Sequence, residues 1–281
     1  MLSVGTLTET PASPAEVEPL LSGSFVNPIA IFVATRWELQ AARRVLSTDR
    51  TAMVGGVSCA IGRRGDRSYW LIQTGVGPDA AGRAARAVLR EQRMGLVLST
   101  GFACGLAEGA VGDLIVGTEV RSVHHEGAWT VSDKVIICDK DIRARLCAAA
   151  ERAQLSFKIG SLVSAPTVVW QAEEKRALRR LTQAVGLDME SAALATAAQE
   201  QGLPVAIVRT VSDLIDEDLP LDFNLFLRPT GWMKGMQALV CRPSRLVGLN
   251  RLRKQSRLAA DRLSDWFQHY ADAELGVRLS D

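Results

Sequence analysis

Two short apolar segments, each followed by acidic residues, constrain the fold of this 281-residue chain more than any other feature. Gly186–Asp188 is predicted to be a strand, and the run of small residues after Glu190 favours a helix. Val205–Val208 is a second apolar strand, which leads into a segment that ends in Asp213. Open α/β sheets bind ligands where the carboxyl ends of their strands meet. These acids are therefore predicted to share one site, although each taken singly could serve as a helix cap.

Apolar runs of strand length alternate with helix-periodic segments along most of the chain. This alternation is typical of a sheet with helices on both faces. The sequence therefore predicts an α/β fold, a three-layer α/β/α sandwich around a central mixed, twisted sheet. The strands are expected near residues 29–34, 51–61, 69–74, 96–99, 114–120, 158–164, 186–188 and 205–208, and the helices near residues 37–46, 79–92, 142–154, 172–183 and 191–198.

Three parts of the chain differ in composition. Residues 1–27 hold prolines among Ser, Thr and Glu, bury little apolar surface and are expected to form a flexible extension. Residues 28–228 carry the alternating pattern and form the predicted catalytic domain. Residues 229–281 are expected to form an amphipathic helical tail.

Composition narrows the class of protein. A hydrophobic content of 47% is ample for one large α/β domain. No apolar run reaches the roughly 18 residues of a membrane span, and the first residues do not resemble a secretory signal. The five cysteines show no CxxC pairing and are predicted to be reduced thiols in a cytoplasmic protein. A net charge of +2 gives no general case for nucleic-acid binding.

Neither a cofactor nor a metal is predicted. The turn that contains Gly75 and Gly77 follows a strand, but it lacks the third glycine of a dinucleotide fingerprint, so it is predicted to be only a tight strand-to-helix turn. His124 and His125 are adjacent and cannot share one helix face, as a pair of metal ligands on a helix would.

Two motifs resemble the nucleoside phosphorylase and nucleosidase superfamily. The segment LDMESAALA, which begins at Leu187, is similar to the (V/L)-(E/D)-M-E-(S/A)-A-A-(L/I)-A segment of its adenosine-type members, and RTVSD, which begins at Arg209, is similar to their R-(A/T)-(I/V)-S-D segment. The resemblance covers about residues 29–226. It implies a phosphorylase-like domain that acts on a small-molecule nucleoside, as a homo-oligomer in which a neighbouring chain often completes each site.

The same motifs imply roles for particular residues. By resemblance Asp213 donates a proton to the departing purine at N7, a step worth on the order of 10² to 10⁴ in rate, and an aspartate there is typical of adenine-specific relatives. Ser212 and Arg209 would orient it. Glu190 would accept hydrogen bonds from the 2′ and 3′ hydroxyls, while Met189 would lie beneath the ribose, although methionine is as often a core filler.

The attacking species stays undecided between water and phosphate. The segment ATRWELQAA resembles the A-M-E-E-E-V segment of the methylthioadenosine and adenosylhomocysteine nucleosidases, which aligns Glu38 with the glutamate that activates water. Without the resemblance, Glu38 would be an ordinary acid in the first turn of a helix. Arg36 could instead bind inorganic phosphate bidentately. Ser99 stands where phosphorolytic relatives carry an arginine, which favours water.

The segment STGFACGL resembles the family's N-T-G-S-A-G-G-L loop, and it is expected to bring Gly101, Phe102 and Ala103 close to the substrate. Two positions depart from the pattern, because Phe102 replaces a serine and Cys104 replaces a glycine. These departures favour the alternative that the chain is a catalytically inactive nucleoside-binding or regulatory module.

Two further segments resemble the family only in part. SAPTVVW is similar to S-G-D-A-F-I-N, so Val168 and Val169 would flank the purine. Phe223 falls where a nucleosidase phenylalanine covers the 5′ end of the nucleoside. Each could equally be a core residue.

The tail is strongly basic. Between Arg242 and Tyr270 it holds seven basic and two acidic residues, together with an apolar stripe of Leu, Trp and Phe. Such a helix most often docks on its own domain or on a partner subunit. Peripheral adsorption on an anionic membrane is the alternative, because the R-P-S-x-L-x-x-L-x-R-L pattern resembles the tail of hopanoid-associated phosphorylases, which remove adenine from adenosylhopane. The predicted activity is cleavage of the N-glycosidic bond of a 5′-modified adenosine, with adenosylhopane as one candidate substrate.

Overall fold

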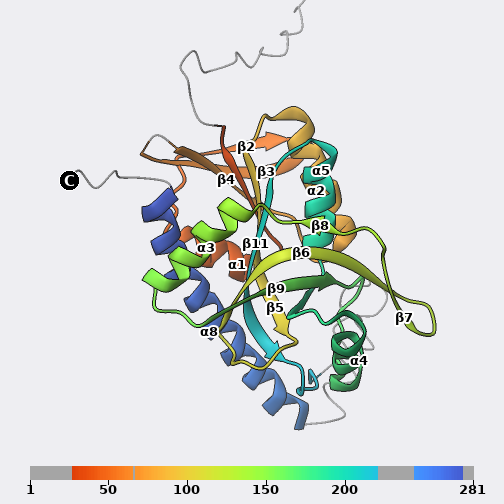
Figure 1. Cartoon of the computed structure of the whole chain (residues 1–281). Helices are drawn as coiled ribbons and strands as arrows, with labels where there is room; N and C mark the ends of the chain where they lie inside the picture. The colour runs from red at the N-terminus through yellow and green to blue at the C-terminus, as the bar shows by residue number, and fades with distance from the viewer. Residues whose placement is uncertain (1–26, 66, 221–243, 275–281) are drawn as a thin grey trace, which may run out of the picture.

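The computed structural model describes residues 27–65, 67–220 and 244–274 (Figure 1). The predicted N-terminal extension and the 5′-site prediction for Phe223 lie outside these residues. A mixed sheet organises the described part of the chain, with the strand order β10-β9-β6-β11-β5-β1-β4-β3-β2 and with β7 and β8 paired to β6. The strands are β1 (Ile29–Val33), β2 (Arg50–Val54), β3 (Val57–Arg64), β4 (Arg67–Gln73), β5 (Leu96–Gly105), β6 (Leu114–His125), β7 (Trp129–Val131), β8 (Ile136–Ile137), β9 (Phe157–Ser164), β10 (Gly186–Asp188) and β11 (Val205–Leu214).

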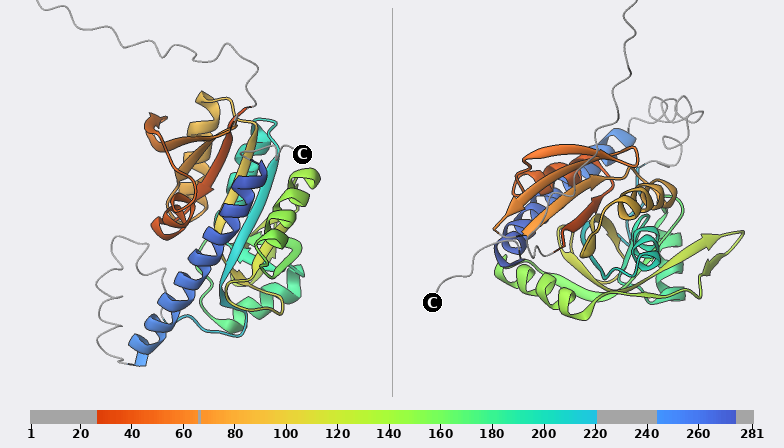
Figure 2. Two further views of the ribbon diagram at one scale, coloured as in Figure 1. Left: turned by 90° about the vertical axis from the view of Figure 1, so that its left-hand side faces the viewer. Right: turned by 90° about the horizontal axis from the view of Figure 1, so that it is seen from above.

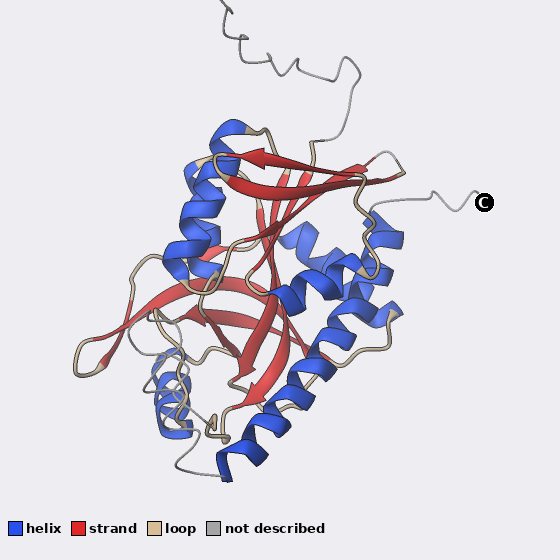
Figure 3. Cartoon of the chain, turned by 180° about the vertical axis from the view of Figure 1, so that it is seen from behind, coloured by secondary structure: helices blue, strands red, loops and turns tan. Residues whose placement is uncertain are grey.

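Helices cover both faces of this sheet, as the alternating pattern predicts. In Figure 1, α2 and α5 lie on one side of the central strands and α1, α3 and α8 on the other, and Figure 3 shows the same layers from behind. Each side encloses its own apolar cluster, so the expected three-layer α/β/α sandwich is confirmed. The described helices are α1 (Arg36–Arg43), α2 (Pro78–Glu91), α3 (Lys140–Arg152), α4 (Ala172–Thr182), α5 (Ser191–Glu200) and α8 (Ser244–Glu274).

Three local expectations need correction. The region near residues 51–61 forms a hairpin rather than one strand, since Gly55 and Gly56 turn the chain with φ angles of 53° and 77°. The STGFACGL segment, expected as a loop, belongs to β5. The end of the RTVSD segment, expected beyond its strand, belongs to β11. These two strands run parallel to each other as far as Gly105 and Leu214, and the pairing keeps both segments extended.

The tail helix α8 packs along the domain (Figure 2). Leu263, Trp266, Phe267 and Tyr270 are completely buried against the same cluster as α1 and α3. The Trp266 indole nitrogen donates to the carbonyl oxygen of Leu146 at 3.2 Å. The apolar stripe of this helix is therefore used within its own domain. None of the described helices is long and apolar enough to cross a membrane.

Candidate active site

A cleft of about 150 Å³ opens near the carboxyl ends of β5, β10 and β11. This is the edge at which ligands bind to open α/β sheets. Its lining includes residues from both strand-end motifs and from the segment before α4. The predicted site residues that line it are Phe102, Ala103, Val168, Val169, Met189, Glu190, Ser212 and Asp213.

Asp213 reaches this cleft because β11 is irregular. The register between β11 and β5 shifts between Val211 and Asp213. Neighbouring residues of a regular strand point to opposite faces, and a bulge redirects them, so Ser212 and Asp213 both line the cleft. Ser212 Oγ donates to Asp213 Oδ1 at 2.9 Å, which agrees with its predicted orienting role.

A lysine holds the other oxygen of this acid. Lys175 of α4 is completely buried, and its Nζ lies 2.6 Å from Asp213 Oδ2. Sequence reasoning missed Lys175, because α4 is rich in charged residues and reads as a solvated helix. The missed signal was its spacing, since Lys175 falls midway between the buried residues Ala172 and Leu178 on one helix face.

Glu190 is deeply buried in the wall of the cleft, and Oε1 of its carboxylate accepts a hydrogen bond from the Gly77 amide at 2.8 Å. Burial raises the pKa of Glu190 from 4.5 to about 7; the nearby acids Asp188 and Glu38 also raise it, whereas Arg209 and the Gly77 amide lower it. The turn at Gly77 was predicted to be only a turn. Its amide instead contacts a predicted substrate-binding acid, and its φ of 97° favours glycine.

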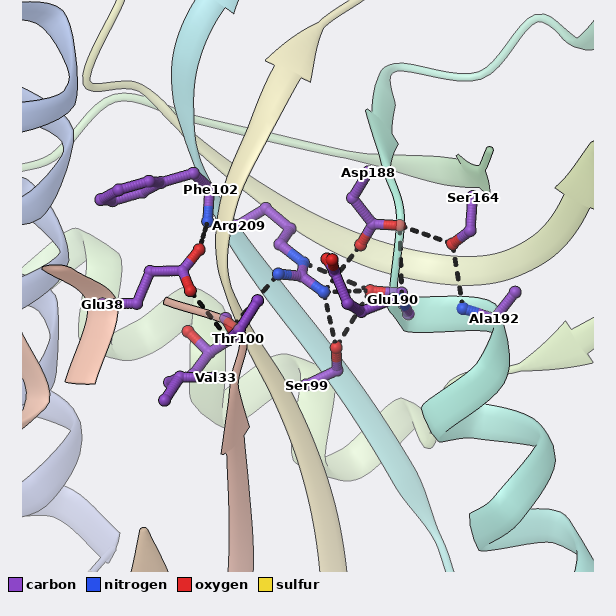
Figure 4. Close-up of polar contacts among 12 residues, drawn as sticks. Val33, Glu38, Ser99, Thr100, Phe102, Ser164, Asp188, Glu190, Ala192 and Arg209 are labelled. Carbon is purple, nitrogen blue, oxygen red and sulfur yellow. Dashed lines mark hydrogen bonds and ion pairs between the residues drawn. The ribbon is translucent and has the colours of Figure 1, made fainter. Parts of the chain in front are cut away.

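Arg209 supports the site through its contact with Asp188 (Figure 4). Its guanidinium, 1% exposed, lies 2.7 Å from Asp188 Oδ2 and donates to Oγ of Ser99 and of Ser191, each at 2.9 Å. The prediction that Arg209 orients Asp213 is therefore wrong, because its side chain is bound to the other strand-end acid. Arg209 therefore holds the carboxylate of Asp188, which lines the cleft, in place.

Glu38 is fixed by three backbone amides. It is the N3 residue of α1 and accepts hydrogen bonds from the amides of Ala34 at 2.8 Å, Thr35 at 2.6 Å and Phe102 at 2.8 Å. Glu38 thus caps its helix and also touches the backbone of a cleft residue, although it does not itself line the cleft. A Cβ atom at Gly101, where φ is 141°, would lie 2.4 Å from Glu38 Oε1. Gly101 therefore allows this contact without lining the cleft.

Arg36 has no part in the wall of the cleft. It is exposed in the first turn of α1. None of the described residues that line the cleft is basic. In the described part of the chain, no group of three or more His, Cys, Asp or Glu side chains is placed to hold a metal ion.

The comparison with protein families agrees with this geometry. The family model described as the phosphorylase superfamily matches residues 28–229, most of the chain. The chain belongs to the phosphorylase superfamily.

The sequence identity between this chain and individual members of the phosphorylase superfamily is low. The chain is 26% identical over 211 residues to the 5′-methylthioadenosine/S-adenosylhomocysteine nucleosidase of Haemophilus ducreyi, which covers 71% of this chain and 90% of that protein. The Neisseria meningitidis nucleosidase of the same name, solved with methylthio-immucillin-A, has a TM-score of 0.65 at 23% identity, with 86% and 99% of the two chains covered. Futalosine hydrolase of Helicobacter pylori gives a TM-score of 0.64 at 19% identity, with 86% and 97% covered. These structures support the fold.

Five further residues line the cleft of this superfamily member without having been predicted to bind a ligand: Cys104, Thr167, Leu187, Asp188 and Leu219. Cys104 is the one thiol among these residues. Burial, followed by the nearby charge of Asp213, raises the pKa of its thiol well above the usual value. Its sulfur is therefore a neutral, weakly nucleophilic part of the wall.

Proposed function

We propose that this chain cleaves the N-glycosidic bond of a 5′-modified adenosine with water and releases adenine. The observation that carries the proposal is that Glu190 and Asp213, from different elements, line one cleft. One carboxyl group then binds the sugar and the other serves the departing base. A catalytically inactive module would only bind the nucleoside, so it would not need an acid such as Asp213 to protonate the departing base.

The base is bound at the Asp213 end. Val168 and Val169 provide apolar surface for the purine ring, while Asp213 protonates N7 as the bond from C1′ breaks. The electron pair of that bond moves into the purine, so a proton delivered to N7 neutralises the leaving group. Ser212 limits the rotation of the carboxyl group through its hydrogen bond at 2.9 Å.

The ribose is bound at the Glu190 end. A carboxylate can accept hydrogen bonds from two adjacent hydroxyl groups at once. Glu190 Oε1 already accepts from the Gly77 amide at 2.8 Å, which fixes its direction. Met189 lies beside the same turn, with its Cε 3.7 Å from the place that a Cβ on residue 77 would take, and it supplies apolar contact to the sugar.

Water is favoured as the attacking species. A phosphate dianion needs cationic partners, whereas no described residue that lines the cleft is basic, Arg36 is exposed, and Arg209 is paired with Asp188 at 2.7 Å. Glu38 is the proposed activator of the water, because its carboxylate is fixed next to the backbone of Phe102.

The test is adenine release from methylthioadenosine, adenosylhomocysteine and adenosylhopane, each with and without phosphate. We expect release at the same rate in both conditions, with a free sugar as the second product. Glu38→Gln should lower the rate by on the order of 10² if Glu38 activates water, and Glu151→Gln, an exposed acid on α3, should not. A sugar 1-phosphate that forms only with phosphate would contradict hydrolysis. Binding without any base release would support the inactive module.

We also propose that the substrate is linked to a membrane. The proposal rests on where α8 lies relative to the cleft. Arg253, Lys254 and Arg257 are exposed on this helix. Gln255 between them donates to the carboxylate of Glu217 at 2.9 Å, next to the cleft wall at Leu219. A basic helix beside the cleft suits a nucleoside held at an anionic surface. We expect co-sedimentation with anionic but not neutral vesicles, reduced when these three residues are changed to Gln; equal recovery with both vesicle types would count against it.

A homo-oligomer is part of the proposal. Met53, Ile137 and Ile159 are each more than half exposed, which suits burial at subunit contacts. Light scattering should give a molar mass that is a multiple of 30.4 kDa; the mass of a single chain would exclude it.

A further inference from the structure

Lys175 is a buried cation that the proposed reaction does not yet use. Its side chain is 0% exposed. An ammonium group has three N–H donors, and Lys175 Nζ has three acceptors, namely Asp213 Oδ2 at 2.6 Å, the Glu217 carbonyl at 2.8 Å and the Leu214 carbonyl at 3.3 Å. Every donor is satisfied, which is what a charged amine requires in the protein interior.

Lys175 contacts Asp213 on the side of the carboxyl group that faces away from the cleft. Asp213 and Ser212 line the cleft, whereas Lys175 does not. Its neighbour on α4, Arg176, shows the usual alternative: its ion pair with Asp216 lies at the surface, where the two side chains are 44% and 73% exposed. The burial of Lys175 is therefore specific to its position behind the proposed general acid.

A buried ion pair is weak support for stability, because desolvation offsets most of the attraction and apolar residues of similar volume often serve as well. Lys175 also joins the acid to the cleft wall, since Glu217 precedes Leu219 by two residues and the Leu219 amide donates to the Trp170 carbonyl at 2.8 Å. These contacts restrict how the carboxyl group of Asp213 can turn.

We propose that Lys175 is a positioning residue for the departure of the base, which rests on the proposed function. Its ammonium holds Asp213 Oδ2, so the carboxyl group keeps one orientation towards the purine. In the free chain Asp213 is the carboxylate partner of Lys175, so it first takes up a proton from solvent on Oδ1, the oxygen that Lys175 does not hold. When Asp213 transfers this proton to N7, the electron pair of the C1′–N bond passes to the base and the carboxylate forms again beside a cation that is already in place. Lys175 keeps its own protons throughout.

The first test compares Lys175→Gln and Lys175→Arg with the control Arg176→Gln. Because misplacement of a catalytic group by about 1 Å can cost on the order of 10² in rate, Lys175→Gln should lower kcat roughly 10- to 100-fold with KM nearly unchanged. Lys175→Arg keeps the charge but places its donors differently, so it should lose about three- to tenfold. Arg176→Gln should match the unaltered chain. Lys175→Arg keeps the buried charge paired, so it provides a folded variant if Lys175→Gln does not fold.

The second test repeats both Lys175 substitutions in the Asp213→Asn background. If Lys175 acts through Asp213, its effects should shrink to less than about twofold there, because residues that act as a unit are not additive. The same loss in both backgrounds, or an unchanged kcat in the folded Lys175 variants, would overturn the proposal. If the unaltered chain releases no adenine, it is instead the proposed function that fails.

Discussion

Asp213→Asn is expected to lower kcat for adenine release by at least ~10², the usual scale of general-acid catalysis. Asparagine has nearly the same shape and can still accept from Ser212, but it has no acidic proton to give to N7. The change also leaves the Lys175 ammonium, 2.6 Å away, without its carboxylate, so the folded fraction has to be measured together with the rate.

Two controls separate proton transfer from structural damage. Asp216→Asn changes an acid three residues further on that is 73% exposed, and it should leave kcat unchanged. A ribosyl nitrophenolate has a leaving group that needs no proton, so Asp213→Asn should process it almost as fast as the unaltered chain does. An equal loss on both substrates would remove Asp213 from the role of acid.

Glu190→Gln is expected to stabilise the folded chain at alkaline pH while it weakens nucleoside binding. Burial is the main cause that raises the pKa of Glu190 from 4.5 to about 7. Below pH 4.5 Glu190 is protonated in both the folded and the unfolded chain. The cost of ionising a buried carboxyl group then does not lower the free energy of unfolding. From pH 4.5 to 7 the unfolded chain releases the proton first, so stability falls as pH rises. Above pH 7 this cost is complete, on the order of 3 kcal/mol for such a shift.

Urea denaturation at pH 4 and pH 8 measures this difference. Glu190→Gln should change the free energy of unfolding little at pH 4 and raise it at pH 8, and KM for the nucleoside should increase because a neutral amide is a weaker acceptor. Glu200→Gln is the control of opposite sign, since the hydrogen bond from Arg86 lowers the pKa of Glu200 and its small contribution is present only at the higher pH. If Glu190→Gln raised the free energy of unfolding equally at both pH values, ionisation of the buried Glu190 would not be the cause.

The sequence predicted the sheet, its helical layers and most of the cleft, because these depend on local patterns. Glu190 follows β10 and Asp213 lies near the end of β11, and both strands pair with the end of β5, which brings the two acids to one cleft. The prediction was less accurate where the outcome depends on pairing between distant strands. Strands β5 and β11 extend through their motif segments because each satisfies the other's backbone groups, which neither segment reveals alone.

The charged contacts were harder to predict. Lys175 and Asp213 are 38 residues apart, and Arg209 and Ser99 are 110 residues apart. A motif names the residue types but not their partners, so Arg209 was assigned to the nearby Asp213 although its guanidinium binds Asp188. Only the three-dimensional arrangement decides between two acids at the ends of two different strands.

The contact between Phe102 and Glu38 bears on the departure from the family pattern at position 102, where phenylalanine replaces a serine. Position 102 reaches this carboxylate through its peptide nitrogen, and nineteen of the twenty amino acids supply that group. The replacement of serine by phenylalanine therefore leaves the link intact, and proline is the one residue that would abolish it. A comparison of side chains along this strand underestimates how much of the site distant homologues share, because part of it is built from the main chain.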